Sequence, residues 1–230
     1  VGIDETNRRF FVSDHGKLKI FAYDLDSVLT TPEYQPSVKI DMKKKLFPDD
    51  YLYLNDTLCI ARIIEPVGNN DYKPSVARWN MATGEINPMP YEYPDLKKVR
   101  FIYAASAEHQ LYVQCYTQYD LMTICDFNGN LKCNIYGPKW VNEKTQTQHY
   151  SLGVEFCGDK ILALYSGGDH RTDAYYPTKF LVFDLNGNYL KTLETGYMIT
   201  DFCYDKENNR LIINLNDEIQ FAYLDLEGII

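Results

Sequence analysis

The chain has 230 residues, a formal net charge of -9, and 45% hydrophobic residues, among them 20 tyrosines. An acidic chain lacks the basic footprint that nucleic acid requires, so nucleic acid is not an expected partner. The length fits one large all-β domain or two ordinary ones, and no stretch reads as a signal peptide or a transmembrane span. Because the sequence starts at Val1, we expect a processed or trimmed product, with a lipid anchor possible upstream of Val1.

In chain order, strand-length apolar runs alternate with Asn, Asp and Gly turns, and no segment keeps a helical period. This alternation predicts five units of strands: 1–4, 9–13, 17–23 and 38–40; 47–54, 57–64, 75–79 and 85–89; 99–105, 111–116, 121–126 and 131–136; 151–156, 160–165, 179–184 and 189–193; 198–204, 210–214 and 219–225.

Two of these units share a hairpin signature. Residues 121–137, LMTICDFNGNLKCNIYG, and 179–196, KFLVFDLNGNYLKTLETG, align so that Asp126 matches Asp184 in Asp-x-Asn-Gly-Asn. Asn and Gly tolerate the positive φ that tight hairpin turns need. Looser copies at 23–26, 79–84 and 224–228 indicate an internal repeat.

A repeated four-stranded unit predicts an all-β fold, a β-propeller of four-stranded antiparallel blades, as a single domain over 1–230. The expected blades are about 1–41, 46–90, 99–137, 151–196 and 198–230. A β-sandwich also contains many short strands, but it is not expected to repeat one hairpin with the same turn residues.

The six cysteines lie inside apolar strand patterns and form no C-x-x-C pair: Cys59, Cys115, Cys125, Cys133, Cys157 and Cys203. We expect them to be small buried hydrophobic residues. A cross-strand disulfide between Cys125 and Cys133 is the alternative if the turn between them has three residues.

The recurring pattern of strand, strand-Asp-x-x-Gly and strand resembles the six-bladed propellers of the NHL-like and TolB-like group. The openings of the first unit, IDETNRRFFVSD at 3–14 and KIFAYDL at 19–25, are similar to a blade of the TolB-like proteins of anaerobic gut bacteria. The resemblance implies an exported protein, periplasmic or anchored to the outer membrane, often through lipid, and it supplies no catalytic residues. This chain departs from it in showing five units, so we expect a six-bladed ring that lacks its N-terminal part.

In a four-stranded meander, the loops between the second and third strands lie on the same face as the crossings from blade to blade. That face carries the three longest insertions, at 65–74, 139–148 and 167–177. Loops beyond ordinary hairpin length usually serve a function or are disordered. We therefore predict the binding surface on this face.

The richest segment of that face is 167–177, with candidate ligand-binding residues Asp169, His170, Arg171, Asp173, Tyr175 and Tyr176. The two tyrosines could stack on a sugar or peptide while Asp169 and Arg171 hydrogen-bond to it. In the alternative, Arg171 pairs locally with Asp169 or Asp173 in a solvated loop. Trp140, in the preceding crossing, is either a second platform or a packing residue between blades.

Catalysis has one alternative form, in which Asp4, Glu155 and Asp201 project from inner strands into a central channel. Two carboxylates across a sugar bond can act as acid and base, as in a glycoside hydrolase. No metal motif is present. Calcium remains possible at acidic second-to-third strand loops, which contain Asp14, His15, Asp71, Asp120, Asp169, His170, Asp217 and Glu218.

The sequence thus favours a non-catalytic recognition propeller of the bacterial cell envelope. Its expected partner is a carbohydrate, a peptide or a protein, with no cofactor. A glycoside hydrolase or related enzyme with carboxylates in the central channel is the alternative.

Overall fold

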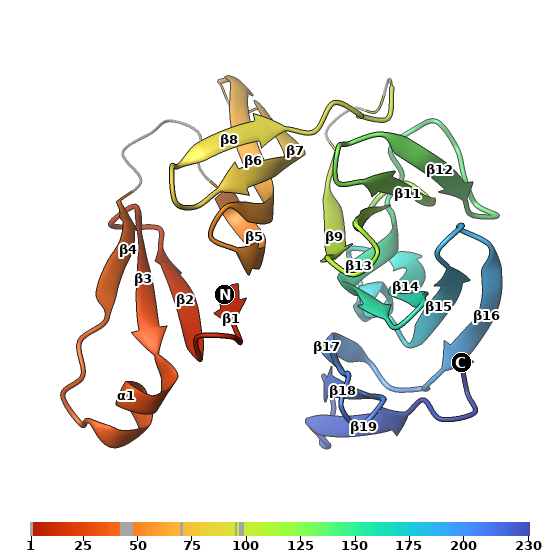
Figure 1. Cartoon of the computed structure of the whole chain (residues 1–230). Coiled ribbons are helices and arrows are strands. Elements are labelled where there is room, and N and C mark those ends of the chain that lie inside the picture. The colour runs from red at the N-terminus through yellow and green to blue at the C-terminus, as the bar shows by residue number, and fades with distance from the viewer. Residues whose placement is uncertain (1, 42–47, 70, 95, 97–98) are drawn as a thin grey trace. The chain divides into compact units, whose positions relative to one another are not determined.

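The computed structural model describes residues 2–41, 48–69, 71–94, 96 and 99–230. These residues form a β-propeller of five antiparallel sheets, each of which is one blade (Figure 1). The predicted fold class is therefore confirmed. The first residues of two predicted strands, Val1 and Phe47, lie outside the described residues.

The blades follow one another along the chain, and their strands pair in sequence order. The strands of the five blades, in order, are β1 (Gly2–Asp4), β2 (Arg9–Asp14), β3 (Lys19–Asp24) and β4 (Ser37–Asp41); β5 (Pro48–Asn55), β6 (Leu58–Gly68), β7 (Asp71–Asn80) and β8 (Glu85–Pro88); β9 (Phe101–Ser106), β10 (Leu111–Tyr116), β11 (Leu121–Asp126) and β12 (Leu131–Tyr136); β13 (Thr147–Cys157), β14 (Lys160–Asp169), β15 (Lys179–Asp184) and β16 (Tyr189–Glu194); β17 (Ile199–Asp205), β18 (Arg210–Leu215) and β19 (Phe221–Asp225).

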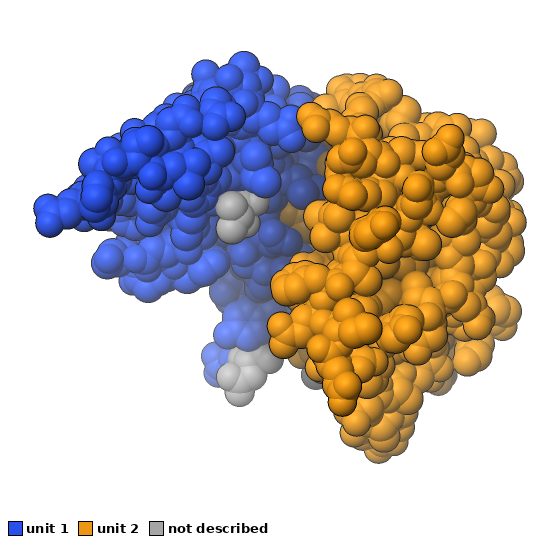
Figure 2. Space-filling model, turned by 90° about the horizontal axis from the view of Figure 1, so that it is seen from below, with its two compact units in different colours: residues 1–92 blue, residues 93–230 orange. Residues whose placement is uncertain are grey.

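The chain divides into two compact units, coloured separately in Figure 2. Unit 1 spans residues 1–92 and holds the first two blades, and unit 2 spans residues 93–230 and holds the last three. The boundary falls between the predicted second and third blades. The expectation of a single domain stays a prediction.

Within each unit the apolar core lies between neighbouring blades. In unit 1, Phe11 and Ile20 of the first blade pack with Ala61 and Trp79 of the second. In unit 2, β14 is buried on both faces, because its side chains alternate: Ile161 and its neighbours face the third blade, and Leu162 and its neighbours face the fifth. Alternation along a strand thus builds two cores from one element.

The two Asp-x-Asn-Gly-Asn segments form matching turns, as predicted. In each, Oδ1 of the first residue, Asp126 or Asp184, accepts hydrogen bonds from the backbone N–H groups two and four residues later, at 2.8 to 2.9 Å. The glycines adopt φ of 80° at Gly129 and 85° at Gly187, which a residue with a Cβ adopts only with strain. The aspartate satisfies the turn's amides and the glycine reverses the chain.

One predicted loop is wrong. The insertion predicted at 65–74 is a strand extension in its described part, because β6 and β7 continue as a paired ribbon as far as Gly68 opposite Asp71. Among the described residues, pairing of β6 with β5 ends at Ile63, and pairing of β7 with β8 ends at Ala77 apart from one bond from the Met89 N–H to the Val76 carbonyl. Beyond these points no described strand pairs with the edges of the ribbon. Pro66 and Pro74, which suggested a loop, are tolerated on such edges because no neighbouring strand needs their missing N–H.

Two short helices were not predicted. α1 (Leu25–Thr30) lies in the β3–β4 connection, where Asp24 caps it by accepting a hydrogen bond from the Ser27 N–H at 2.8 Å. A single 3-10 turn (Asp173–Tyr175) lies in the β14–β15 connection. Both are shorter than the windows in which a helical period can be read. The fifth blade has three strands, as the sequence indicated.

All six cysteines are free, so the alternative of a Cys125–Cys133 disulfide is wrong. A bulge in the β11–β12 pairing sets Cys125 opposite Leu131 and Cys133 opposite Ile124. Four of the cysteines are buried, as expected. Cys133 is half-buried and Cys203 is exposed, which the apolar pattern around them did not indicate.

Candidate functional site

Two segments that are distant in sequence meet in unit 2, and we call them together the loop surface. They are residues 137–148, which form the blade crossing and the start of β13, and residues 166–177, which form the end of β14 and most of the β14–β15 connection. Thr147 of β13 pairs with Asp169 of β14, so both segments leave from one extended hairpin. The backbone N–H of His170 donates to the Gln146 carbonyl at 3.2 Å, and its Nδ1 lies 2.9 Å from the same oxygen. The expected meeting of a crossing with a second-to-third strand loop occurs here.

The crossing is held at both ends by the β10–β11 connection. The Gly137 N–H donates to the Asp120 carbonyl at 2.8 Å, and the Lys139 N–H donates to Asp120 Oδ2 at 2.9 Å. Further along, Thr145 Oγ1 donates to the Gln118 carbonyl at 3.2 Å. These bonds make the crossing an ordered base rather than a free linker.

A buried polar group lies beneath this base. The side chains of Asp120 and His149 are almost fully buried, with Asp120 Oδ1 3.7 Å from His149 Nδ1, which itself lies 3.3 Å from the Tyr165 hydroxyl. Burial lowers the pKa of His149 against the opposing effect of Asp120, so the imidazole is neutral at pH 7. Burial also raises the pKa of Tyr165. Asp120, one of the residues at which the sequence left calcium possible, fastens the crossing.

On the loop surface, the charges of 167–177 are paired locally, as in the alternative drawn from the sequence. Arg171 donates from Nε and Nη2 to the two carboxylate oxygens of Asp169 at 3.0 and 2.7 Å. Hydrogen bonds from Arg171 hold the pKa of Asp169 well below its usual range. Arg171 nevertheless remains two-thirds exposed.

The two tyrosines of the segment stack on each other, with ring centroids 4.2 Å apart and planes at 30°. The 3-10 turn that carries them begins at Asp173 and is capped by Thr172. Ser166 fastens the turn by donating to the Ala174 carbonyl at 2.6 Å. Tyr175 and Tyr176 are half-buried and therefore form a fixed ring pair rather than two independent platforms.

Trp140 is a packing residue. Its ring lies within 5.2 to 6.3 Å of the rings of Tyr93, Tyr119 and Tyr136, measured between centroids. Tyr119 is buried and Trp140 is half-buried, so the cluster fixes the start of the crossing. The structure shows these packing contacts, and the role of Trp140 as a binding platform stays a prediction.

The three carboxylates of the alternative enzyme hypothesis differ in their surroundings. Glu155 on β13 is half-buried, and burial together with the charge of Asp201 on the packed strand β17 raises the pKa of Glu155 to about 7. Asp4 belongs to unit 1, where its carboxylate accepts hydrogen bonds from Arg9 at 2.6 Å and Asn7 at 2.9 Å. Asp4 thus closes a turn, while Glu155 and Asp201 form an acidic pair.

In the part of the chain that the structure describes, no three His, Cys, Asp or Glu side chains come together as a metal site. Calcium binding stays a prediction. Among the same residues, no helix is long and apolar enough to cross a membrane.

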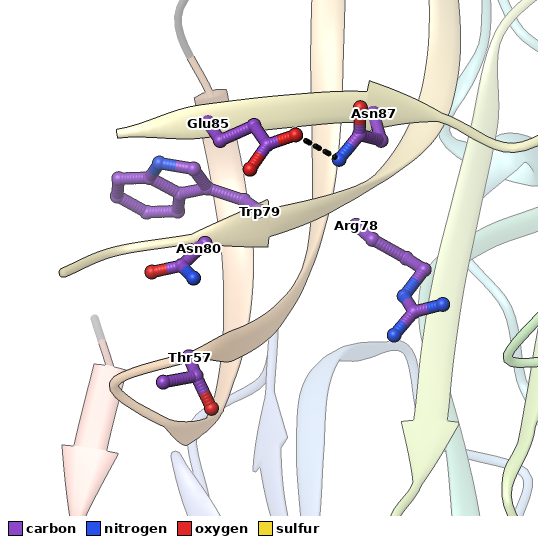
Figure 3. Close-up of a pocket in the computed structure, with 6 residues that line it drawn as sticks. All are labelled: Thr57, Arg78, Trp79, Asn80, Glu85 and Asn87. Atoms are coloured by element: carbon purple, nitrogen blue, oxygen red, sulfur yellow. Dashed lines mark hydrogen bonds between the residues drawn. The ribbon is translucent and has the colours of Figure 1, made fainter. Parts of the chain in front are cut away.

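One site was missed by the sequence reasoning: a pocket of about 390 Å³ on the second blade, which we call the Arg78 pocket. It is lined by Thr57, Arg78, Trp79, Asn80, Glu85 and Asn87 (Figure 3). Arg78 lies opposite Asn87 and Asn80 lies opposite Glu85 across β7 and β8, so these four residues share one face of the sheet. The signal was present as polar residues at every second position on both sides of the 81–84 turn.

No protein-family model and no curated protein sequence matches this chain. Solved structures match its fold. A member of the DUF4221 family from Bacteroides vulgatus has a TM-score of 0.62 at 12% identity, covering 95% of this chain and 76% of that one. The extracellular domain of a putative one-component system from B. thetaiotaomicron has a TM-score of 0.58 at 11% identity, covering 98% of this chain and 27% of that one.

A gluconolactonase from Xanthomonas campestris has a TM-score of 0.56 at 16% identity, covering 93% of this chain and 67% of that one. The chain thus spans about a quarter of the extracellular domain and two thirds to three quarters of the other two proteins. At these identities the likenesses show the fold alone. The resemblance to TolB-like and NHL-like propellers stays a prediction.

Proposed function

We propose that the protein is a non-catalytic recognition propeller that binds a carbohydrate, a peptide or a protein partner at the loop surface. One observation carries the proposal: two insertions distant in sequence are hydrogen-bonded into one ordered surface over the buried Asp120 and His149. A surface held in its binding geometry loses little conformational entropy when a ligand arrives. The Tyr175–Tyr176 pair supplies apolar area, and exposed Arg171 of the same segment keeps the N–H groups that Asp169 does not engage.

The proposal includes export to the cell envelope. It is supported by the extracellular domains of putative one-component and hybrid two-component systems from B. thetaiotaomicron, which share the fold. In such a setting a propeller would recognise a ligand outside the cell. Detection of the endogenous protein in envelope rather than cytosolic fractions would test this part, and a purely cytosolic protein would contradict it.

Binding is tested on an oligosaccharide array and a peptide array with purified protein. We expect at least one class to bind the wild type and to be lost in the Tyr175→Ala/Tyr176→Ala double variant, because the apolar ring pair is removed. Tyr72→Ala is the matched control, since Tyr72 is 58% exposed on the β6–β7 ribbon of unit 1. The proposal would be contradicted if neither array showed binding and a pull-down from envelope extract recovered the same proteins with the wild type and the double variant, or if the control lost binding equally.

A second candidate function is hydrolysis of a glycosidic bond by Glu155 and Asp201. It is favoured by the pKa of Glu155, which at about 7 suits a general acid near neutral pH, while Asp201 beside it provides the second carboxylate. Release of aryl aglycone from a panel of aryl glycosides would test it. Turnover that disappears in Glu155→Gln supports the enzyme, and no turnover on the panel by the wild type sinks it.

A further inference from the structure

The Arg78 pocket contains two opposite charges that do not neutralise each other. Five of the seven arginines pair with carboxylates: Arg8, Arg9, Arg62, Arg171 and Arg210. Arg78 is exposed and makes no ion pair with any carboxylate in the described ranges, although Glu85 lies diagonally across from it on β8. In a chain with a net charge of -9, an arginine left without a carboxylate on a pocket wall is available for a ligand oxyanion.

The other groups of the pocket divide into donors and acceptors. Asn80 uses Oδ1 to accept from the Thr83 N–H at 3.0 Å, so its Nδ2 is available as a donor in the pocket lining. Asn87 uses Nδ2 to donate to Glu85 Oε1 at 3.2 Å, so its Oδ1 remains to accept, as does the second oxygen of Glu85. Thr57 Oγ1 donates to Asn55 Oδ1 at 2.8 Å and keeps its lone pairs for a further donor.

We propose that the Arg78 pocket binds a small zwitterion, an amino acid with a free carboxylate and a free ammonium group. Arg78 and Asn80 donate to the carboxylate. Glu85 and Asn87, which are hydrogen-bonded to each other on β8, accept from the ammonium group, and Thr57 lines the pocket on the other side of β7. The pocket carries one positive and one negative side chain, and a zwitterion matches both charges. A purely anionic ligand would leave Glu85 unmatched.

Packing of β7 against the core of unit 1 holds the polar side chains of the pocket on one face of the sheet. Trp79, between Arg78 and Asn80, turns its ring into the core of unit 1 and is 2% exposed. Its ring meets that of Tyr51 edge-on, with centroids 5.2 Å apart. Because side chains alternate along β7, burial of Trp79 fixes Arg78 and Asn80 on the opposite face. The pocket lies in unit 1, so its role is independent of the loop surface proposed above.

The test is titration calorimetry with each of the twenty common amino acids, with thermal shift as a second readout. We expect at least one to bind and its affinity to fall at least about tenfold in Arg78→Gln and in Glu85→Gln, because each removes one charge partner. Arg100→Gln is the matched control, since Arg100 is exposed, lies outside the pocket and has no ion-pair partner among the described residues. It should bind as the wild type does.

Two derivatives of the bound amino acid separate its charged groups. The N-acetyl form lacks the ammonium charge and the carboxamide form lacks the carboxylate, and we expect both to bind at least about tenfold more weakly. The proposal is overturned if no amino acid binds, if Arg78→Gln binds normally while folded, or if the N-acetyl form binds as tightly as the parent. Unchanged melting temperatures would show that the variants remain folded.

Discussion

The loop surface and the Arg78 pocket contain similar residue types but use them in opposite ways. On the loop surface, Arg171 is paired with Asp169 and the tyrosines are stacked on each other. In the pocket, Arg78 and Glu85 stand on one sheet face without an ion pair between them. The first region pairs its arginine with a neighbouring carboxylate and offers a shaped surface, whereas the second keeps its arginine and glutamate available. A rich local composition therefore does not by itself show which charges a ligand can use.

The largest expected difference between the regions is in stability. Trp140→Ala removes a ring packed against three tyrosines, and we expect a loss of about 2–3 kcal/mol in the free energy of unfolding of unit 2. Arg78→Gln removes an exposed side chain without an ion-pair partner among the described residues, so we expect a change within about 0.5 kcal/mol. Urea unfolding followed by circular dichroism measures both.

Trp140→Phe is the control for the first variant, because it keeps an aromatic ring in the cluster and should recover most of the loss. A Trp140→Ala variant as stable as the wild type would show that the ring does not pack. It would also return Trp140 to the role of a binding platform.

The different outcomes for turns and loops have a physical reason. The Asp126 and Asp184 turns could be predicted because their hydrogen bonds run between residues two and four apart, so the sequence contains every partner. The β6–β7 ribbon could not be predicted from its prolines, because whether a proline is tolerated depends on where the neighbouring strands end. Local bonds can be read from sequence, whereas edges depend on the assembled sheet.

A second prediction uses pH, because the loop surface rests on a buried histidine and the Arg78 pocket does not. The pKa of His149 is lowered in the folded chain by burial. As the pH falls below about 6.5, the unfolded chain therefore gains a proton that the folded chain lacks. The free energy of unfolding of unit 2 then decreases by up to about 1.4 kcal/mol per pH unit. The stability that unit 2 has with His149 neutral is therefore complete above that pH and is lost progressively below it. His149→Gln should remove this part of the slope.

The chain's two tryptophans allow each region to be followed separately, since Trp140 lies in unit 2 and Trp79 in unit 1. Fluorescence-detected urea unfolding of Trp79→Phe reports the loop surface, and that of Trp140→Phe reports the second blade.

The raised pKa of Glu155 changes stability in the opposite direction, because the contribution of protonated Glu155 to the free energy of unfolding is lost as the pH rises towards about 7. Each single-tryptophan variant is therefore compared with the same variant carrying His149→Gln, so that the contribution of Glu155 cancels. An unchanged slope in His149→Gln would contradict the assignment.

The candidate sites illustrate the same limit on sequence reasoning. The chemistry of 167–177 was visible in the sequence, and both pairings of Arg171 were weighed, but only the fold shows that Asp169 engages it through two oxygens. The Arg78 pocket needs the β7–β8 register to place Arg78 opposite Asn87. Its residues alternate with apolar ones, a pattern typical of any half-exposed strand. Whether a charged side chain is available to a ligand therefore depends on which other side chains the fold places against it.

The third prediction, with the smallest effect on the protein, concerns the reactivity of its arginines. A guanidinium engaged by a carboxylate through two hydrogen bonds is a weaker target for an arginine-specific dione than an unengaged one. Brief treatment with phenylglyoxal, followed by peptide mass spectrometry, should therefore label Arg78 and Arg100 before Arg171. In Asp169→Asn, which removes the negative partner, Arg171 should be labelled as fast as Arg78. Exposure alone predicts no such order, because Arg171 is itself two-thirds exposed. Equal labelling of Arg78 and Arg171 in the wild type would remove the contrast between an internally satisfied surface and an available pocket, and the amino acid proposal would lose its premise.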